Sequence, residues 1–74
     1  MREWLYRERV DRRKTMKDMA KALGVSEGYY CLIEQGKRCP SLSVLQIRNL
    51  SKALGFPMML AVDAELDYAK EVRE

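Results

Sequence analysis

Hydrophobic residues recur along the chain three and four positions apart, the spacing of amphipathic helices, and no strict alternation with polar residues lasts beyond a few positions. After Thr15 the apolar positions fall at i, i+3, i+4 and i+7, and they are Met16, Met19, Ala20 and Leu23. Thr15 suits the N-cap of this helix, and Gly24 suits its end because glycine readily takes a positive φ. Valine and isoleucine are sparse, which disfavours strands. The pattern predicts an all-α protein.

Helices are also predicted on either side of this segment. Trp4 and Leu5 begin one that ends near Arg13. Ser26 can cap another, which ends at Gly36. Steps of 100° per residue divide this later helix into two faces. Its inward face consists of Ser26, Tyr29, Tyr30 and Ile33. Its outward face consists of Gly28, Cys31, Leu32 and Gln35.

The C-terminal half predicts two more helices. Ser43 is the cap of one, because Gln46 at its N3 position completes a capping box. Leu42 and Ile47 flank this cap and can pack together as a hydrophobic staple. The buried residues of this helix are Ile47, Leu50 and Leu54. Pro57 suits the first turn of the last helix. The apolar face of that helix consists of Met58, Met59, Leu60, Val62, Leu66, Tyr68, Ala69 and Val72.

The length and composition fit one small globular domain that spans residues 1–74. The chain is 47% hydrophobic and 34% charged. No segment approaches the roughly 18 uninterrupted apolar residues of a membrane span. Met1 leads directly into a charged stretch, without the apolar region of a signal peptide. We therefore expect a cytoplasmic protein.

The reactive residue types argue against a metal site and against an enzyme. Cys31 and Cys39 occur in a chain without histidine, so one copy assembles neither a four-ligand zinc site nor a Cys-His nucleophile. The sequence also has no glycine-rich phosphate loop and no recognisable pair of catalytic carboxylates. We expect two reduced thiols, one on a helix face and one in a loop, and no cofactor.

Positive charge is concentrated in the first half of the chain. Residues 1–38 carry ten lysines and arginines against six acidic residues, whereas residues 39–74 carry four against five. This asymmetry indicates a polyanionic partner for the first half. For Arg2 and Arg73, at the two ends of the chain, exposure to solvent is the simpler expectation.

The predicted helices on either side of "LGVS" are joined by the short, glycine-containing turn of a helix-turn-helix. From Thr15 to Ser41 the chain resembles the Cro and lambda-repressor-like regulators, the XRE family. The resemblance rests on the pattern A-x-x-L-G-V-S followed by Y-x-x-I-E-x-G-K-R-x-P-S, and more loosely on "WLYRER" and "LSKALG". It implies a five-helix lambda-repressor-like DNA-binding domain, with the helix-turn-helix at its second and third helices.

The resemblance also implies which residues contact DNA. Lys17 can replace a phosphate contact at Met16, where the family commonly has glutamine. The phosphate contacts are then expected from Thr15, Lys17, Lys37 and Arg38. The base-facing residues are expected to be Glu27, Gly28, Tyr29 and Leu32. In the repressors of this family an arginine late in the first helix pairs with a glutamate of the third, which implies a structural ion pair between Arg9 and Glu34.

Several positions depart from the family. Glu8, Arg13 and Lys14 stand where it tends to have leucine, glycine and leucine, so we expect an irregular end to the first helix. The chain is also longer between "GKR" and the fourth helix. At the base-facing positions, Glu27 can accept a hydrogen bond from cytosine and Leu32 can touch a thymine methyl group, but the usual amides and arginines are missing. Base specificity should therefore be low or unusual.

We expect a DNA-binding transcriptional regulator, a repressor, that reads the major groove of double-stranded DNA with residues 27–35. The segment 57–74 is a candidate homodimerisation element because its apolar face is broad. The alternative for this segment is that it folds back over the first helix and covers Trp4 and Leu5. The alternative is an antitoxin that binds both a toxin and DNA, or a protein-interaction module in which Gly28, Cys31 and Leu32 bind a polypeptide. Salt discriminates between these alternatives, because only phosphate contacts weaken steeply as salt is added.

Overall fold

Five helices, joined by turns and loops, make up the fold. The computed structural model describes residues 1–73, and their side chains through residue 71. The helices are α1 (Glu3–Asp11), α2 (Met16–Leu23), α3 (Glu27–Glu34), α4 (Val44–Leu54) and α5 (Met58–Arg73). No strand occurs among residues 1–73, and the all-α, five-helix prediction is confirmed. None of these helices, as far as they are described, has both the length and the apolar character needed to cross a membrane.

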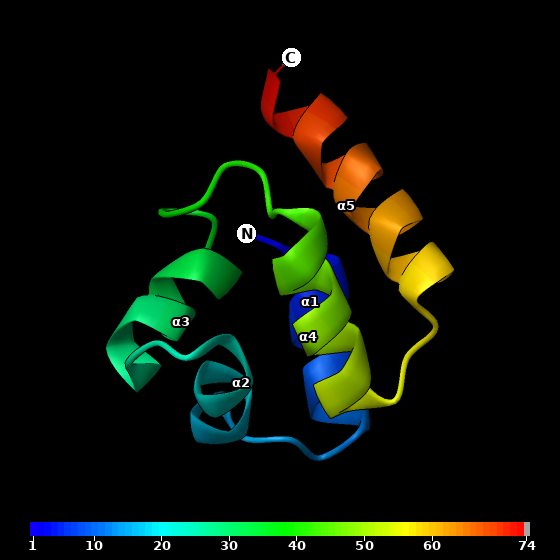
Figure 1. Cartoon of the computed structure of the whole chain (residues 1–74). Helices are drawn as coiled ribbons and strands as arrows, with labels where there is room; N and C mark the ends of the chain where they lie inside the picture. The colour runs from blue at the N-terminus through cyan, green and yellow to red at the C-terminus, as the bar shows by residue number, and fades with distance from the viewer. Residues whose placement is uncertain (74) are drawn as a thin grey trace.

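The helices α2 and α3 pack together, and α4 connects this pair to α5. Figure 1 shows α2 and α3 together on one side of the molecule and α5 on the other. The helix α4 contacts both α2 and α5, and α1 contacts α3. The segment between α3 and α4 runs as an irregular loop around the end of the molecule where the C-terminus also lies (Figure 1). This arrangement leaves the side of α3 that faces away from α1 uncovered.

The ends of the helices follow from local sequence. The three predicted N-caps are confirmed, and they are Thr15, Ser26 and Ser43. Thr15 and Ser43 each form a complete capping box, with Asp18 and Gln46 respectively. Such a box satisfies two of the backbone N–H groups that have no partner within the helix. Gly24 ends α2 in the left-handed conformation, as the sequence predicts, and Gly55 ends α4 in the same way.

A single hydrophobic core holds the helices together. Its buried members are Leu5, Met19, Ala20, Tyr30, Ile33, Leu42, Ile47, Leu50, Leu54 and Ala61. The predicted burial of Tyr30 and Ile33 on α3 is therefore confirmed, as is that of the three positions on α4. Burying one such side chain contributes about 1.5–3 kcal/mol of transfer free energy. Tyr30 and Ile33 thus fix which side of α3 faces the interior.

The first helix begins and ends earlier than predicted. It begins at Glu3 and ends at Asp11 rather than near Arg13. Arg13 has a φ of 56°, a left-handed conformation that an α-helix of L-residues does not continue through. Its amide bonds to the carbonyl of Val10 at 3.0 Å, which closes the helix end. The irregular end expected from the missing glycine is therefore located at Arg13.

On α3, two of the predicted inward positions are wrong. Ser26 and Tyr29 are exposed, whereas Tyr30, Ile33 and Glu34 are buried. Ser26 acts as the N-cap, so its side chain turns back to the backbone of the first turn. Tyr29 lies on the flank of the helix rather than on its inner face. The buried face is therefore displaced toward Glu34.

The apolar face of α5 is narrower than predicted. Met59, Leu60 and Leu66 are exposed, so Met59 does not fill the core. The buried residues on this helix are Ala61, Glu65 and Tyr68, while the side chain of Val72 lies outside the described residues. Pro57 precedes α5 instead of lying in its first turn, and its carbonyl accepts the amide of Ala61 at 3.1 Å.

Candidate nucleic-acid interface

The turn between α2 and α3 sets the direction of α3. Gly24 has φ and ψ of 70° and 31°, and the amide of Val25 bonds back to the carbonyl of Ala20 at 3.0 Å. A Cβ on Gly24 would meet nothing within 4 Å, so the backbone conformation, not space, favours glycine here. The turn brings α3 against α2 and leaves the outer side of α3 free.

This outer side of α3 carries few hydrogen-bonding groups. Glu27, Gly28 and Gln35 are exposed, whereas Cys31 and Leu32 are half-buried. A Cβ built on Gly28 would meet nothing within 4 Å, so the surface of the helix is open at this residue. The amide of Gln35 lies 3.4 Å from the sulfur of Cys31. Three of the predicted base-facing residues, Glu27, Gly28 and Leu32, therefore lie on or beside this surface.

Tyr29, the fourth predicted base-facing residue, instead connects α3 to the following loop. Its side chain is 39% exposed, and its hydroxyl lies 3.7 Å from the sulfur of Cys39. This hydrogen bond with the thiol raises the pKa of Tyr29 above its ordinary value. Both cysteines are free thiols, one on a helix and one in a loop, as the sequence predicts.

Two cations follow directly after α3. Gly36 ends the helical region with a φ of 80°, and the amides of Lys37 and Arg38 both bond to the carbonyl of Leu32, at 2.9 and 3.3 Å. The side chains of Lys37 and Arg38 are exposed, and neither forms an ion pair with a residue that the structure describes. Their positive charge is therefore available to an anion beside the end of α3.

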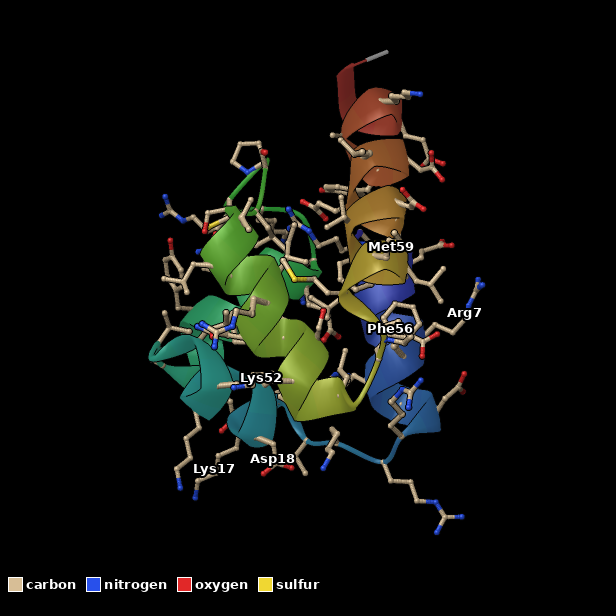
Figure 2. The ribbon with its side chains drawn as sticks, turned by 45° about the vertical axis from the view of Figure 1, so that its right-hand side comes forward. Arg7, Lys17, Asp18, Lys52, Phe56 and Met59 are labelled. Carbon is tan, nitrogen blue, oxygen red and sulfur yellow. The ribbon has the colours of Figure 1, made fainter. Side chains whose placement is uncertain are left out.

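The start of α2 supplies a third exposed cation. Thr15 and Lys17 are both exposed, while Met16 is half-buried and packs against the core. Figure 2 shows Lys17 pointing away from the body of the molecule, with Asp18 beside it and Arg7 on the other side. The hydrogen bond from the backbone of Thr15 lowers the pKa of Asp18. A carboxylate thus lies next to Lys17.

The structure brings Arg9 and Glu34 together. Nε and Nη2 of Arg9 donate to the two carboxylate oxygens of Glu34 at 2.8 and 3.0 Å. The hydroxyl of Tyr30 donates to the same carboxylate at 2.7 Å. The hydrogen bond with Glu34 raises the pKa of Arg9, and burial is the main reason that the pKa of Tyr30 is raised. This cluster joins α1 to the end of α3 on the side away from solvent.

The expectation that Arg2 lies in solvent is wrong. Arg2 is 0% exposed and forms an ion pair with Glu65 of α5 at 2.7 Å. The sequence gives a signal only for Glu65, which lies on the apolar face of its helix between Ala61 and Tyr68. A carboxylate placed there needs a cationic partner. The side chain of Arg73 lies outside the described residues.

The described residues form no metal site, and the groove that they line near α1 and α5 lies away from the helix-turn-helix. Among the described residues, no group of three or more His, Cys, Asp or Glu could hold a metal ion. A groove of about 490 Å³ lies between the start of α1 and α5, where Trp4 and Tyr68 are among its lining residues. None of its lining residues belongs to α2, α3 or the loop after α3.

Comparison with known proteins agrees with this geometry. Residues 5–58 match a family model described as helix-turn-helix. The chain belongs to the helix-turn-helix family. This family consists of DNA-binding transcription regulators, and the matched residues include α2 and α3 with the turn that joins them. The protein is 38% identical over 56 residues to the "Uncharacterized HTH-type transcriptional regulator YqaF" of Bacillus subtilis (strain 168), which covers 76% of this chain and 71% of that protein. No solved structure matches the chain significantly.

Proposed function

We propose that this helix-turn-helix protein is a repressor that binds double-stranded DNA with α3 in the major groove. The observation that carries the proposal is the open outer side of α3, with the exposed cations Lys37 and Arg38 shortly after the end of the helix. A helix of this size fits the major groove, and cations at its end meet the phosphates that border the groove. Repression follows when the bound site overlaps a promoter.

The phosphate contacts come from both ends of the helix-turn-helix. Lys37 and Arg38 hold the backbone beside the end of α3, and Thr15 and Lys17 hold it at the start of α2. Each phosphate neutralised by such a cation releases counterions, so affinity falls as salt rises. The neighbouring carboxylate of Asp18 weakens the contribution of Lys17.

The base-facing surface permits only limited discrimination. Gly28 lets the backbone of α3 approach the bases closely but reads none of them. Leu32 contacts a thymine methyl group, and Glu27 accepts a hydrogen bond from cytosine. Tyr29 lies at the edge of the groove because its side chain leans toward Cys39.

The protein binds as a homodimer through α5, with the segment 57–74 as the dimerisation element. Met59 and Leu66 are 78% and 56% exposed, and seven residues, or about two helical turns, place them on one side of α5. A second copy would cover this apolar stripe and would double the number of DNA contacts. Two recognition helices of a dimer read half-sites about 34 Å apart. Sedimentation that shows only monomers at high concentration, with and without duplex, would rule the dimer out.

A protein-binding role is the alternative that one observation favours. On the outer side of α3, Gly28, Cys31 and Leu32 lie beside the exposed Glu27 and Gln35. The first three suit an apolar polypeptide such as a toxin better than base edges. An antitoxin would use this surface for its partner and the cations for DNA. Binding to an apolar partner should change little between low and high salt, whereas binding to phosphates should not survive the same change.

The decisive experiment selects bound sites from random duplexes. The proposal predicts enrichment of a two-fold symmetric site, and lower expression from a promoter that carries it. A Leu32→Gln variant should shift the preferred base at one position of each half-site toward adenine, because a glutamine amide pairs with adenine. Its affinity for random duplex should stay unchanged, since the phosphate contacts remain. Absence of any enrichment, together with salt-independent binding, would exclude the proposed function.

A further inference from the structure

Arg2 lies at the centre of a buried network of hydrogen bonds. Its Nε and Nη2 donate to the two oxygens of Glu65 at 2.8 and 2.7 Å. Its Nη1 donates to the carbonyl of Ile33 at 2.7 Å, and Nη2 also donates to the carbonyl of Cys39. The backbone amide of Arg2 donates to the carbonyl of Glu34 at 2.8 Å. One residue thus contacts the end of α3, the loop after it and α5.

Glu65 extends this network to the end of the same loop. One of its oxygens accepts the amide of Leu42 at 3.1 Å, and the other accepts the indole N–H of Trp4 at 3.1 Å. Leu42 is the residue immediately before the N-cap of α4. The loop is therefore held by the ion pair at two points, the carbonyl of Cys39 and the amide of Leu42.

Apart from this network, the loop is held by the amides of Lys37 and Arg38, which bond to the carbonyl of Leu32, and by the buried side chain of Leu42. Cys39 has a φ of 52°, a conformation that is strained for a residue with a side chain. The loop contains no helix or strand, and Lys37 and Arg38, which lie within it, are exposed. At its other end, a Cβ on Gly36 would lie 2.5 Å from the hydroxyl of Tyr68, whose ring packs under the Arg2 guanidinium at 4.6 Å.

A role in stability alone does not account for this network. Burying an ion pair costs desolvation free energy, and apolar side chains of similar volume often stabilise a fold as well or better. An arginine that bonds a carboxylate and two carbonyls simultaneously, however, fixes the relative positions of all three groups, because its donors form a rigid planar fork.

We infer that Arg2 and Glu65 are positioning residues that hold the loop of residues 36–42 in the conformation in which Lys37 and Arg38 meet the DNA phosphates. This inference rests on the proposed DNA binding. It makes the N-terminus and α5, which lie outside the helix-turn-helix, necessary for full affinity. It also explains how a longer loop can still present its cations in fixed positions.

The test compares Arg2→Lys with Arg7→Lys. Both changes keep the net charge, but Arg2 is buried whereas the side chain of Arg7 is 70% exposed. Lysine at position 2 cannot bond Glu65 and both carbonyls at once. Two quantities are measured where far-UV circular dichroism shows that each variant is folded. The first is hydrogen exchange at the amides of Leu42 and Val25, and the second is affinity for one duplex as a function of salt.

For Arg2→Lys we expect the protection of Leu42 to fall about tenfold relative to that of Val25, which lies in the turn between α2 and α3. Affinity for the duplex should fall about tenfold. This is the effect expected from the loss of one hydrogen bond to a charged group. The slope of log affinity against log salt should flatten by roughly one to two units, because two phosphate contacts loosen. Arg7→Lys should match the wild type in every measurement.

Two results would overturn the inference. Equal loss of protection at Leu42 and Val25 would assign Arg2 to global stability alone. Unchanged affinity and salt slope, despite loss of protection at Leu42, would show that the order of the loop does not matter for DNA. If Arg2→Lys does not fold, Glu65→Gln is read by the same criteria. Failure of the wild type to bind duplex in a salt-dependent manner would instead overturn the proposed function, and the two failures are thereby distinguished.

Discussion

Arg9 and Glu34 form a two-pronged ion pair in which the carboxylate is 1% exposed and the guanidinium 11% exposed. Tyr30 supplies a third hydrogen bond to the same carboxylate. The pair connects α1 with the last turn of α3, four residues before Arg38. Loss of this connection would therefore disturb both the core and the position of α3.

Removal of one partner should leave the charge of the other without its counterion. We expect Glu34→Ala to lower the free energy of unfolding by about 3–5 kcal/mol, because Arg9 would keep a partly buried charge without its counterion. This loss approaches the whole stability of a small domain, about 5 kcal/mol. Urea melts of Arg9→Ala, Glu34→Ala and the double variant measure the coupling between the two sites.

A matched pair in the same chain provides the control. Arg12 and Glu8 lie 3.1 Å apart, but their side chains are 36% and 24% exposed. The same cycle at that pair should give a coupling below about 1 kcal/mol. Equal coupling energies at the two pairs would contradict the account of a buried link.

The capping box of α2 should make stability depend on pH. The backbone amide of Thr15 donates to Asp18, which lowers the pKa of that carboxyl in the folded protein. A depressed folded-state pKa contributes stability above the pKa of the unfolded chain, near 3.9, and this stability is lost as pH falls through the folded value. Asp18→Ala should therefore destabilise the protein near pH 7 but much less near pH 2. The capping box at Ser43 uses the uncharged Gln46, so the loss from Gln46→Ala should not share this dependence.

Gly36 should be less replaceable than Gly55. Both glycines have positive φ values, 80° and 69°, so alanine is strained at either position. A Cβ would meet nothing within 4 Å at Gly55, but at Gly36 it would lie 2.5 Å from the hydroxyl of Tyr68. Gly55→Ala should cost about 1 kcal/mol, and Gly36→Ala clearly more. Thermal melts should also show that Tyr68→Phe recovers part of the loss in the Gly36→Ala background and none in the Gly55→Ala background.

Ser51 is a site where a small change should stabilise the protein. Its hydroxyl is buried within α4 and has no hydrogen-bond partner among the described residues. Alanine removes this unsatisfied group, keeps almost all of the packing and has a higher helix propensity. We expect Ser51→Ala to raise the free energy of unfolding by about 1 kcal/mol. A loss of stability in denaturant melts would indicate that the hydroxyl has a partner in solution.

The parts of the fold that were predictable from the sequence depend on neighbouring residues. The caps at Thr15, Ser26 and Ser43 bond to amides three residues later, so a short stretch of sequence is sufficient to find them. The buried positions on α4 follow helical spacing for the same reason. The resemblance to repressors added the pairing of Arg9 with Glu34. These two residues are 25 positions apart, so helical spacing could not have paired them.

The parts that were missed depend on distant residues. Arg2 and Glu65 are 63 positions apart, and no local pattern shows that the start of the chain meets α5. The position of the Tyr29 side chain similarly depends on Cys39, which lies ten residues away in a loop without helical periodicity. The exposure of Met59 on α5 could not be derived either, because it depends on which neighbour covers which side of the helix.

The central claim is that Lys37 and Arg38 hold DNA phosphates beside α3. The most direct test is the slope of log affinity against log salt for one duplex, measured for the wild type and for Lys37→Ala/Arg38→Ala. The control is Arg7→Ala/Lys70→Ala, which removes the same charge from α1 and α5, outside the helix-turn-helix. We predict that the first double variant binds every duplex more weakly and that its slope flattens by roughly one to two units, while the control keeps the wild-type slope. An unchanged slope in Lys37→Ala/Arg38→Ala, or the same flattening in the control, would contradict the claim.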